Sequence, residues 1–83
     1  MSQIYVKYGG EQKTYEFTDV FTPERNLVMG LTEPVIPNQL SERQVKTALC
    51  QKLDINMSEL EDHYVEINPN GNITLRPESG WGT

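Results

Sequence analysis

The chain has 83 residues, of which 36% are hydrophobic and 23% are charged, and its formal net charge is −5. This length supports one small domain, and the composition is ordinary for a globular chain and too apolar for full disorder. The 7 basic side chains are scattered among 12 acidic ones, which argues against a protein that binds the phosphate backbone of nucleic acids. Solubility alone explains the acidity, although a basic groove on a partner protein would also be attracted.

The sequence shows no targeting or membrane segment. No run approaches the ~18 apolar residues that a membrane span requires, and the N-terminus lacks the basic segment and long apolar run of a secretory signal. The single cysteine, Cys50, excludes an internal disulfide and lies beside an apolar helical stripe, so we expect a buried thiol. Together these features predict a cytoplasmic protein without a membrane partner.

Two segments near the N-terminus, 3–8 and 13–18, alternate between polar and apolar residues and predict a β-hairpin. Their apolar side chains share one face: Ile4, Val6, Tyr8, Tyr15 and Phe17. A four-residue loop over 9–12 would align these faces and pair Ile4 with Phe17.

The segment 19–39 has no clear period. Thr22 followed by Pro23 is a helix-start signal and predicts a short helix over 23–29. A brief edge strand over 27–29 is the alternative, and two later prolines predict extended, turn-like backbone. A connection of this length in a small domain indicates either a functional loop or an undetected element.

The segment 40–53 predicts the main helix. Ser41 is placed as its N-cap, and Gln44 has the spacing that closes a capping box. The apolar stripe comprises Val45, Ala48, Leu49 and Leu53. Glu42 and Lys46 lie four residues apart on the other face, in the favourable order.

The segments 63–67 and 72–76 predict a second hairpin. The turn between them has proline at its second position and Gly71 at its fourth, which fits a type I turn followed by a left-handed glycine. This three-residue loop places Ile67 opposite Ile73. The predicted apolar face comprises Val65, Ile67, Ile73 and Leu75.

An acidic stretch precedes this hairpin. Ser58 and Glu61 have the spacing of a capping box, which predicts one helical turn. We interpret Glu59, Glu61, Asp62 and Glu66 as a solvated acidic face, because such a face is several times more frequent than a metal or acid–base site. Of these residues, Glu59, Glu61 and Asp62 are expected to contact a protein partner.

Catalytic chemistry is not indicated. His63 is the single histidine, and a nucleophilic pair with Cys50 would need an activating group and an oxyanion site that the sequence does not suggest. We therefore expect no catalytic residues, no metal and no cofactor.

These elements predict an α+β domain over 1–76, in which two hairpins form a sheet of about four strands and the helix after Ser41 packs on one face. Residues 77–83 form an extended tail in this interpretation. The predicted core comprises Ile4, Val6, Tyr15, Phe17, Val45, Ala48, Leu49, Leu53, Val65, Ile67, Ile73 and Leu75.

Several short motifs resemble ubiquitin-like β-grasp proteins. The segment 3–7, Gln-Ile-Tyr-Val-Lys, looks like the first strand of ubiquitin. The Glu33-Pro34 turn, the helix start over 41–45 and the glycine-containing end over 80–82 are similar to small prokaryotic ubiquitin-like proteins. Those proteins are found in bacterial mobile-element operons beside E1-like genes. The resemblance implies a β-grasp fold, and a generic two-layer α/β sandwich is the alternative.

The C-terminus departs from the pattern of a conjugated modifier. Such a protein ordinarily ends in Gly-Gly, whereas this chain ends in Gly-Trp-Gly-Thr, so Thr83 would have to be removed before Gly82 could be activated.

The sequence therefore predicts a non-enzymatic protein-interaction module, either a ubiquitin-like modifier or a relic of one, with a protein partner and no nucleic acid. The tail residues Gly80, Trp81 and Gly82 are expected to contact the partner, since tryptophan is a frequent interface anchor. The alternative is a small acidic inhibitor, encoded by a phage or mobile element, that binds a host protein or a nucleic-acid enzyme.

Overall fold

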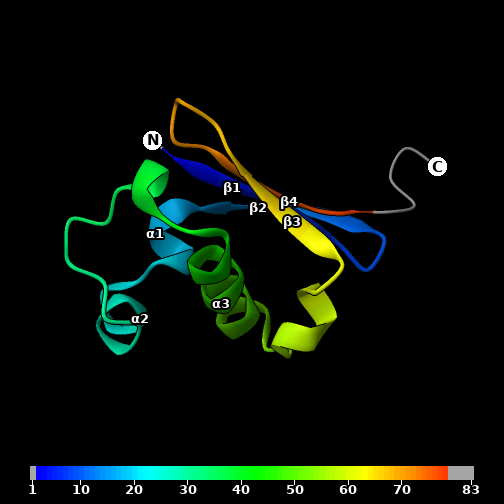
Figure 1. The fold of residues 1–83 in the computed structure, drawn as a ribbon, viewed down its shortest axis with the longest axis horizontal. Coiled ribbons are helices and arrows are strands. Elements are labelled where there is room, and N and C mark those ends of the chain that lie inside the picture. Colours follow the sequence, from blue (N-terminus) through cyan, green and yellow to red (C-terminus); the bar gives the residue numbers. More distant parts are fainter. Residues whose placement is uncertain (1, 79–83) are drawn as a thin grey trace.

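The computed structural model describes residues 2–78 and has an α+β fold of two layers. One layer is a four-stranded mixed sheet, and the helices form the other layer on one side of it (Figure 1). The strands are β1 (Gln3–Tyr8), β2 (Glu11–Glu16), β3 (His63–Ile67) and β4 (Ile73–Pro77). The helices are α1 (Phe17–Val20), α2 (Pro23–Val28) and α3 (Glu42–Leu53), and the 3-10 turns are η1 (Pro37–Gln39) and η2 (Met57–Leu60).

The strand order in the sheet is β2-β1-β4-β3. Each outer strand pairs antiparallel with its hairpin neighbour, and the two central strands, β1 and β4, pair in parallel. The prediction of two hairpins with one main helix on one face is confirmed, and the parallel central pair makes the sheet mixed. β2 and β3 are the edge strands.

The second hairpin has the predicted register. Ile67 pairs with Ile73, and Val65 pairs with Leu75. Gly71 closes the turn with its N–H 2.9 Å from the carbonyl oxygen of Asn68, and its φ of 93° is the positive value expected of a glycine at this position.

Pairing in this hairpin continues slightly beyond the predicted end of the domain. Pro77 is the last residue of β4, and the N–H of Glu78 donates to the carbonyl oxygen of Asp62 at 2.6 Å. The rest of the predicted tail, 79–83, lies outside the described residues.

The predicted register of the first hairpin is wrong by two residues. Ile4 pairs with Tyr15 and Val6 with Lys13, because the loop contains only Gly9 and Gly10. Both glycines have positive φ, 62° and 79°, which suits a two-residue hairpin loop of type I′. A shift of two residues keeps each side chain on its face, so the predicted burial of Ile4 and Val6 is correct.

Phe17 was predicted to lie in the second strand of the first hairpin, but it is the first residue of helix α1. The N–H of Phe17 still bonds to the carbonyl oxygen of Ser2 at 3.1 Å, and the chain then turns into α1. Its ring stacks on that of Phe21 with centroids 4.7 Å apart, and Val20 is also buried. The long connection therefore contains an undetected element that completes the core.

The predicted short helix over 23–29 is present as α2, which ends one residue earlier, at Val28. Thr22 caps α2 by accepting a hydrogen bond from the N–H of Arg25 at 3.2 Å, and the helix ends just before Gly30, whose φ is 74°. Leu27 and Val28 do not form an edge strand. Their side chains are 81% and 78% exposed on α2.

The main helix, α3, begins as predicted. Gln44 N–H donates to Ser41 Oγ at 3.1 Å, and Ser41 N–H donates to Gln44 Oε1 at 2.9 Å, which completes the capping box. Lys46 Nζ lies 3.2 Å from Glu42 Oε2. Asp54 ends the helix in the left-handed conformation, with φ 59°.

The predicted helical turn is present as η2. Its N-cap is Asn56, whereas Ser58, the predicted N-cap, lies inside the turn. Asn56 N–H donates to Glu59 Oε2 at 3.3 Å, and Glu59 N–H donates to the carbonyl oxygen of Asn56 at 3.0 Å. This one-turn element has a packing role, since Leu60 is fully buried.

The hydrophobic core lies between the sheet and α3, and it extends over α1 and η2. Its buried residues are Ile4, Val6, Phe17, Val20, Phe21, Leu40, Val45, Ala48, Leu49, Cys50, Leu60, Ile73 and Leu75. The remaining predicted core residues, Tyr15, Leu53, Val65 and Ile67, are partly buried and pack against this cluster. The expected burial of the Cys50 thiol is confirmed.

Candidate protein-interaction surface

One face of the sheet is covered by the helical layer, and no helix in the described range 2–78 covers the other face (Figure 1). Because side chains alternate along a strand, the residues between the buried ones point to this open side. We call it the uncovered face. It comprises Gln3, Tyr5, Lys7, Gln12, Thr14, Glu16, Tyr64, Glu66, Thr74 and Arg76.

Arg76 and Tyr64 contact each other on the uncovered face. They are a cross-strand pair, and the guanidinium carbon of Arg76 lies 4.6 Å from the centroid of the Tyr64 ring. Arg76 Nη2 is also 3.5 Å from Glu66 Oε1. The ring and the guanidinium group therefore hold each other in place on the sheet.

Tyr5 occupies the middle of the same face. It lies on the central strand β1, with Thr14 beside it on β2 and Thr74 beside it on β4. Its hydroxyl donates to Gln3 Oε1 at 3.1 Å. Small neighbours leave a half-buried aromatic ring accessible at the centre of a sheet, and tyrosine and arginine are the side chains that protein interfaces favour.

The three acidic residues proposed from the sequence lie elsewhere, at the junction of η2 and β3. Glu59 has a structural role there: its carboxylate accepts hydrogen bonds from the Tyr8 hydroxyl and, at 3.3 Å, from the N–H of Asn56. These bonds lower the pKa of Glu59, and the bond to Glu59 raises the pKa of Tyr8. Glu59 therefore fixes η2 to the end of β1 and is already engaged within the chain.

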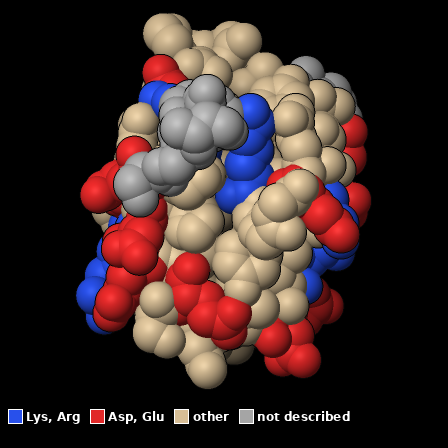
Figure 2. Space-filling view, turned by 90° about the vertical axis from the view of Figure 1, so that its right-hand side faces the viewer, with Lys and Arg blue, Asp and Glu red and all other residues tan. Residues whose placement is uncertain are grey.

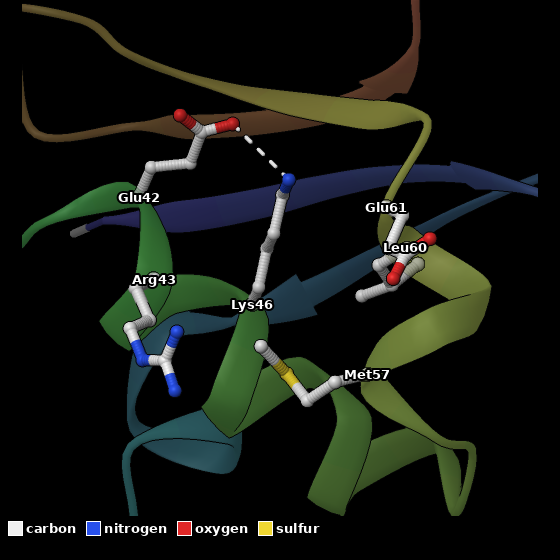
Figure 3. A pocket seen from close by; sticks show the side chains of 6 residues that line it. All are labelled: Glu42, Arg43, Lys46, Met57, Leu60 and Glu61. Atoms are coloured by element: carbon white, nitrogen blue, oxygen red, sulfur yellow. Dashed lines mark ion pairs between the residues drawn. The ribbon is translucent and has the colours of Figure 1, made fainter.

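Glu61 lines an open groove of about 390 Å³ between α3 and η2. Glu42, Arg43 and Lys46 contribute from α3, and Met57 and Leu60 from η2 (Figure 3). We call this hollow the α3–η2 groove. Asp62 follows Glu61 at the start of β3, where its carbonyl oxygen receives the Glu78 N–H.

Figure 2 shows the end of the molecule to which these acidic residues belong, where η2 leads into β3. Acidic side chains outnumber basic ones on this end. Glu59, Glu61 and Asp62 thus belong to an end of the molecule that is rich in acidic side chains, while Gly80, Trp81 and Gly82 lie outside the described residues.

Burial shifts the pKa values of both Cys50 and His63, the two side chains that a nucleophilic pair would require. Burial raises the pKa of the Cys50 thiol, which keeps it protonated near neutral pH, and its Sγ lies 3.5 Å from Met57 Sδ. Burial and the nearby Lys46 charge lower the pKa of His63. Within residues 2–78, no group of three or more histidine, cysteine or acidic side chains is arranged to hold a metal ion.

No protein-family model, curated protein or solved structure matches the chain. The part of the chain that the structure describes also contains no helix of the length and apolar character needed to cross a membrane.

Tyr5, Tyr64 and Arg76 were not among the predicted partner-binding residues, although the sequence contains a signal for them. The alternation that buries Ile4 and Val6 also places Tyr5 on the opposite face. Whether that face is open depends on which side of the sheet each helix packs against. The sequence did not predict this for the segment 19–39.

Proposed function

We propose that this chain is a non-enzymatic protein-interaction module that binds a protein partner through the uncovered face of its sheet. The observation that carries the proposal is the pair of tyrosines, Tyr5 and Tyr64, with Arg76 stacked on the second ring, on a sheet face that no helix of residues 2–78 covers. Aromatic and arginine side chains supply most of the energy of protein interfaces, and their ordering here reduces the entropy lost on binding.

The strand order supports a β-grasp interpretation of the fold. Two hairpins flank one main helix, and the first and last strands, β1 and β4, lie in parallel at the centre of the sheet. This arrangement is the one that the resemblance to ubiquitin-like proteins implies. It makes a modifier, or a relic of one, the more specific form of the proposal.

If the chain is a conjugated modifier, its C-terminus must be processed. Gly82 is the residue that would be activated, so Thr83 and anything that follows it must be cleaved before the carboxylate of Gly82 can be joined to a target. Mass spectrometry of the chain recovered from its own cells tests this directly. A mature chain that ends at Gly82, together with conjugates linked through Gly82, would support a modifier. A chain that retains Thr83 and forms no conjugates would contradict the modifier hypothesis and leave only the interaction module.

Affinity purification from the same cells tests the interaction module itself. We expect Tyr5→Ala and Tyr64→Ala each to weaken partner binding by about 2 kcal/mol, as for central interface residues. Gln51→Ala, an exposed change on α3, is the matched control. Partner recovery that is reduced by the Gln51 change and unaffected by the two tyrosine changes would contradict the proposal.

A further inference from the structure

The outer edge of β3 has hydrogen-bonding groups without partners among the described residues. Asn68 N–H donates to Asn72 at 2.8 Å and Glu78 N–H donates to Asp62, so the even-numbered residues of β3 bond to β4. The backbone N–H and C=O groups of His63, Val65 and Ile67 therefore point away from β4. An edge of this kind is a template for a further strand.

The other edge of the sheet differs in character. β2 carries charged side chains at Glu11, Lys13 and Glu16 and is mostly exposed, which is a common protection against strand addition. The sequence of β3 is His-Tyr-Val-Glu-Ile, and its one acidic side chain, Glu66, is already paired with Arg76. β3 is therefore the edge that lacks protection by charge.

The α3–η2 groove runs beneath this edge, with opposite charges at its two ends. Figure 3 shows Arg43 and Glu42 toward one end and Glu61 at the other, where β3 begins, with Met57 between the two ends and Leu60 beside Glu61. Lys46 is already engaged with Glu42. Neither Arg43 nor Glu61 has an ion-pair partner within residues 2–78.

We propose that β3 pairs antiparallel with β3 of a second copy of this chain, about a two-fold axis at Val65. Under this symmetry the groove is complementary to itself, because Arg43 of each copy lies at the end occupied by Glu61 of the other. His63 pairs with Ile67 of the second copy, and Tyr64 lies opposite Glu66 on the open side. The β3 edge, with the α3–η2 groove beside it, is thus a dimer interface.

The dimer interface is the outer edge of β3, whereas the proposed partner surface is the open face of the sheet; the two share Tyr64 and Glu66, which lie on β3. A two-fold axis perpendicular to the sheet keeps both helical layers on one side, so the two uncovered faces join into one continuous surface. Dimerisation goes beyond the proposed function, and either can fail without the other.

Sedimentation equilibrium of the full chain, from about 1 µM to 1 mM, tests the dimer, because this range brackets a moderate affinity. We expect the mass to rise from 9.5 kDa toward twice that value with concentration. Val65→Pro removes an outward N–H that makes no bond to β4, and it should raise the dissociation constant at least about tenfold. Thr14→Pro makes the equivalent change on the β2 edge and should leave dimerisation unchanged.

A charge exchange gives an independent readout that does not depend on proline. Arg43→Glu and Glu61→Arg alone should each raise the dissociation constant about tenfold, since like charges then face each other, and the double variant should restore it. A chain that stays monomeric to 1 mM overturns the proposal. So does a dimer that tolerates Val65→Pro, or one that the double charge exchange fails to restore.

Discussion

Arg76 lies over the ring of Tyr64, with 4.6 Å between the guanidinium carbon and the ring centroid. A cation over an aromatic ring at a partly exposed site contributes about 0.5–1 kcal/mol. A double-mutant cycle with Arg76→Ala and Tyr64→Ala, measured by chemical denaturation, should therefore give a coupling energy of that size. Glu66→Gln should cost less than about 0.5 kcal/mol, as for an exposed ion pair. Strictly additive effects at Arg76 and Tyr64 would show that the pair does not stabilise the uncovered face.

The turn η2 contributes to stability through Leu60. This side chain is 0% exposed, so Leu60→Ala should lower the free energy of unfolding by about 2–5 kcal/mol. Leu27→Ala is the matched control, because Leu27 is 81% exposed on α2 and its loss should cost less than about 0.5 kcal/mol. Similar values for the two variants, from urea denaturation, would contradict the assignment of η2 to the core.

Gly71 is constrained by both its backbone and a neighbour. Its φ is 93°, and an added Cβ would lie 2.8 Å from Ser2 Oγ, so Gly71→Ala should destabilise the fold by about 1–3 kcal/mol. Gly30→Ala isolates the backbone effect, because Gly30 has a φ of 74° and open space around it. Thermal and chemical unfolding should show the larger loss at Gly71, and a larger loss at Gly30 would refute the close packing of the second turn.

The stability of the chain should fall as the pH is lowered through the ordinary pKa of histidine. Burial and the charge of Lys46 hold the pKa of His63 below 6.5 in the folded chain. Below pH 6.5 the unfolded chain therefore binds a proton that the folded chain does not, which favours unfolding.

We expect the free energy of unfolding to decrease between pH 7.5 and pH 5.5, and His63→Gln to reduce this slope. In an NMR titration the Lys46→Met variant should show a higher pKa for His63 than the unmodified chain. A His63 pKa above 6.5 in the unmodified chain would reverse the sign of the expected pH dependence.

The two hairpins illustrate what the sequence can specify. The turn before Asn72 has a proline and a glycine at defined positions, and these fix one loop length and hence the register. Gly9 and Gly10 fit either a two-residue loop or part of a longer one, and both choices bury the same faces. The faces were therefore predictable in both hairpins, while the register was predictable only in the second.

Short elements and the open side of the sheet were less predictable. α1 and η2 have four residues each, too few to show a helical period, and their burial depends on contacts with distant segments. For the same reason Val20 and Leu60 were absent from the predicted core. The alternation of β1 placed Tyr5 opposite the core, but only the positions of all the helices show that no described helix covers it.

Site-specific photo-crosslinking tests the role of the uncovered face most directly. A benzoylphenylalanine introduced at Tyr5 or Tyr64 should crosslink a partner protein in the native cells, because both side chains lie on the proposed contact surface. The same group at Gln51, exposed on α3, should not. Crosslinks from position 51 with none from positions 5 and 64 would place the partner on the helical layer and contradict the proposed function.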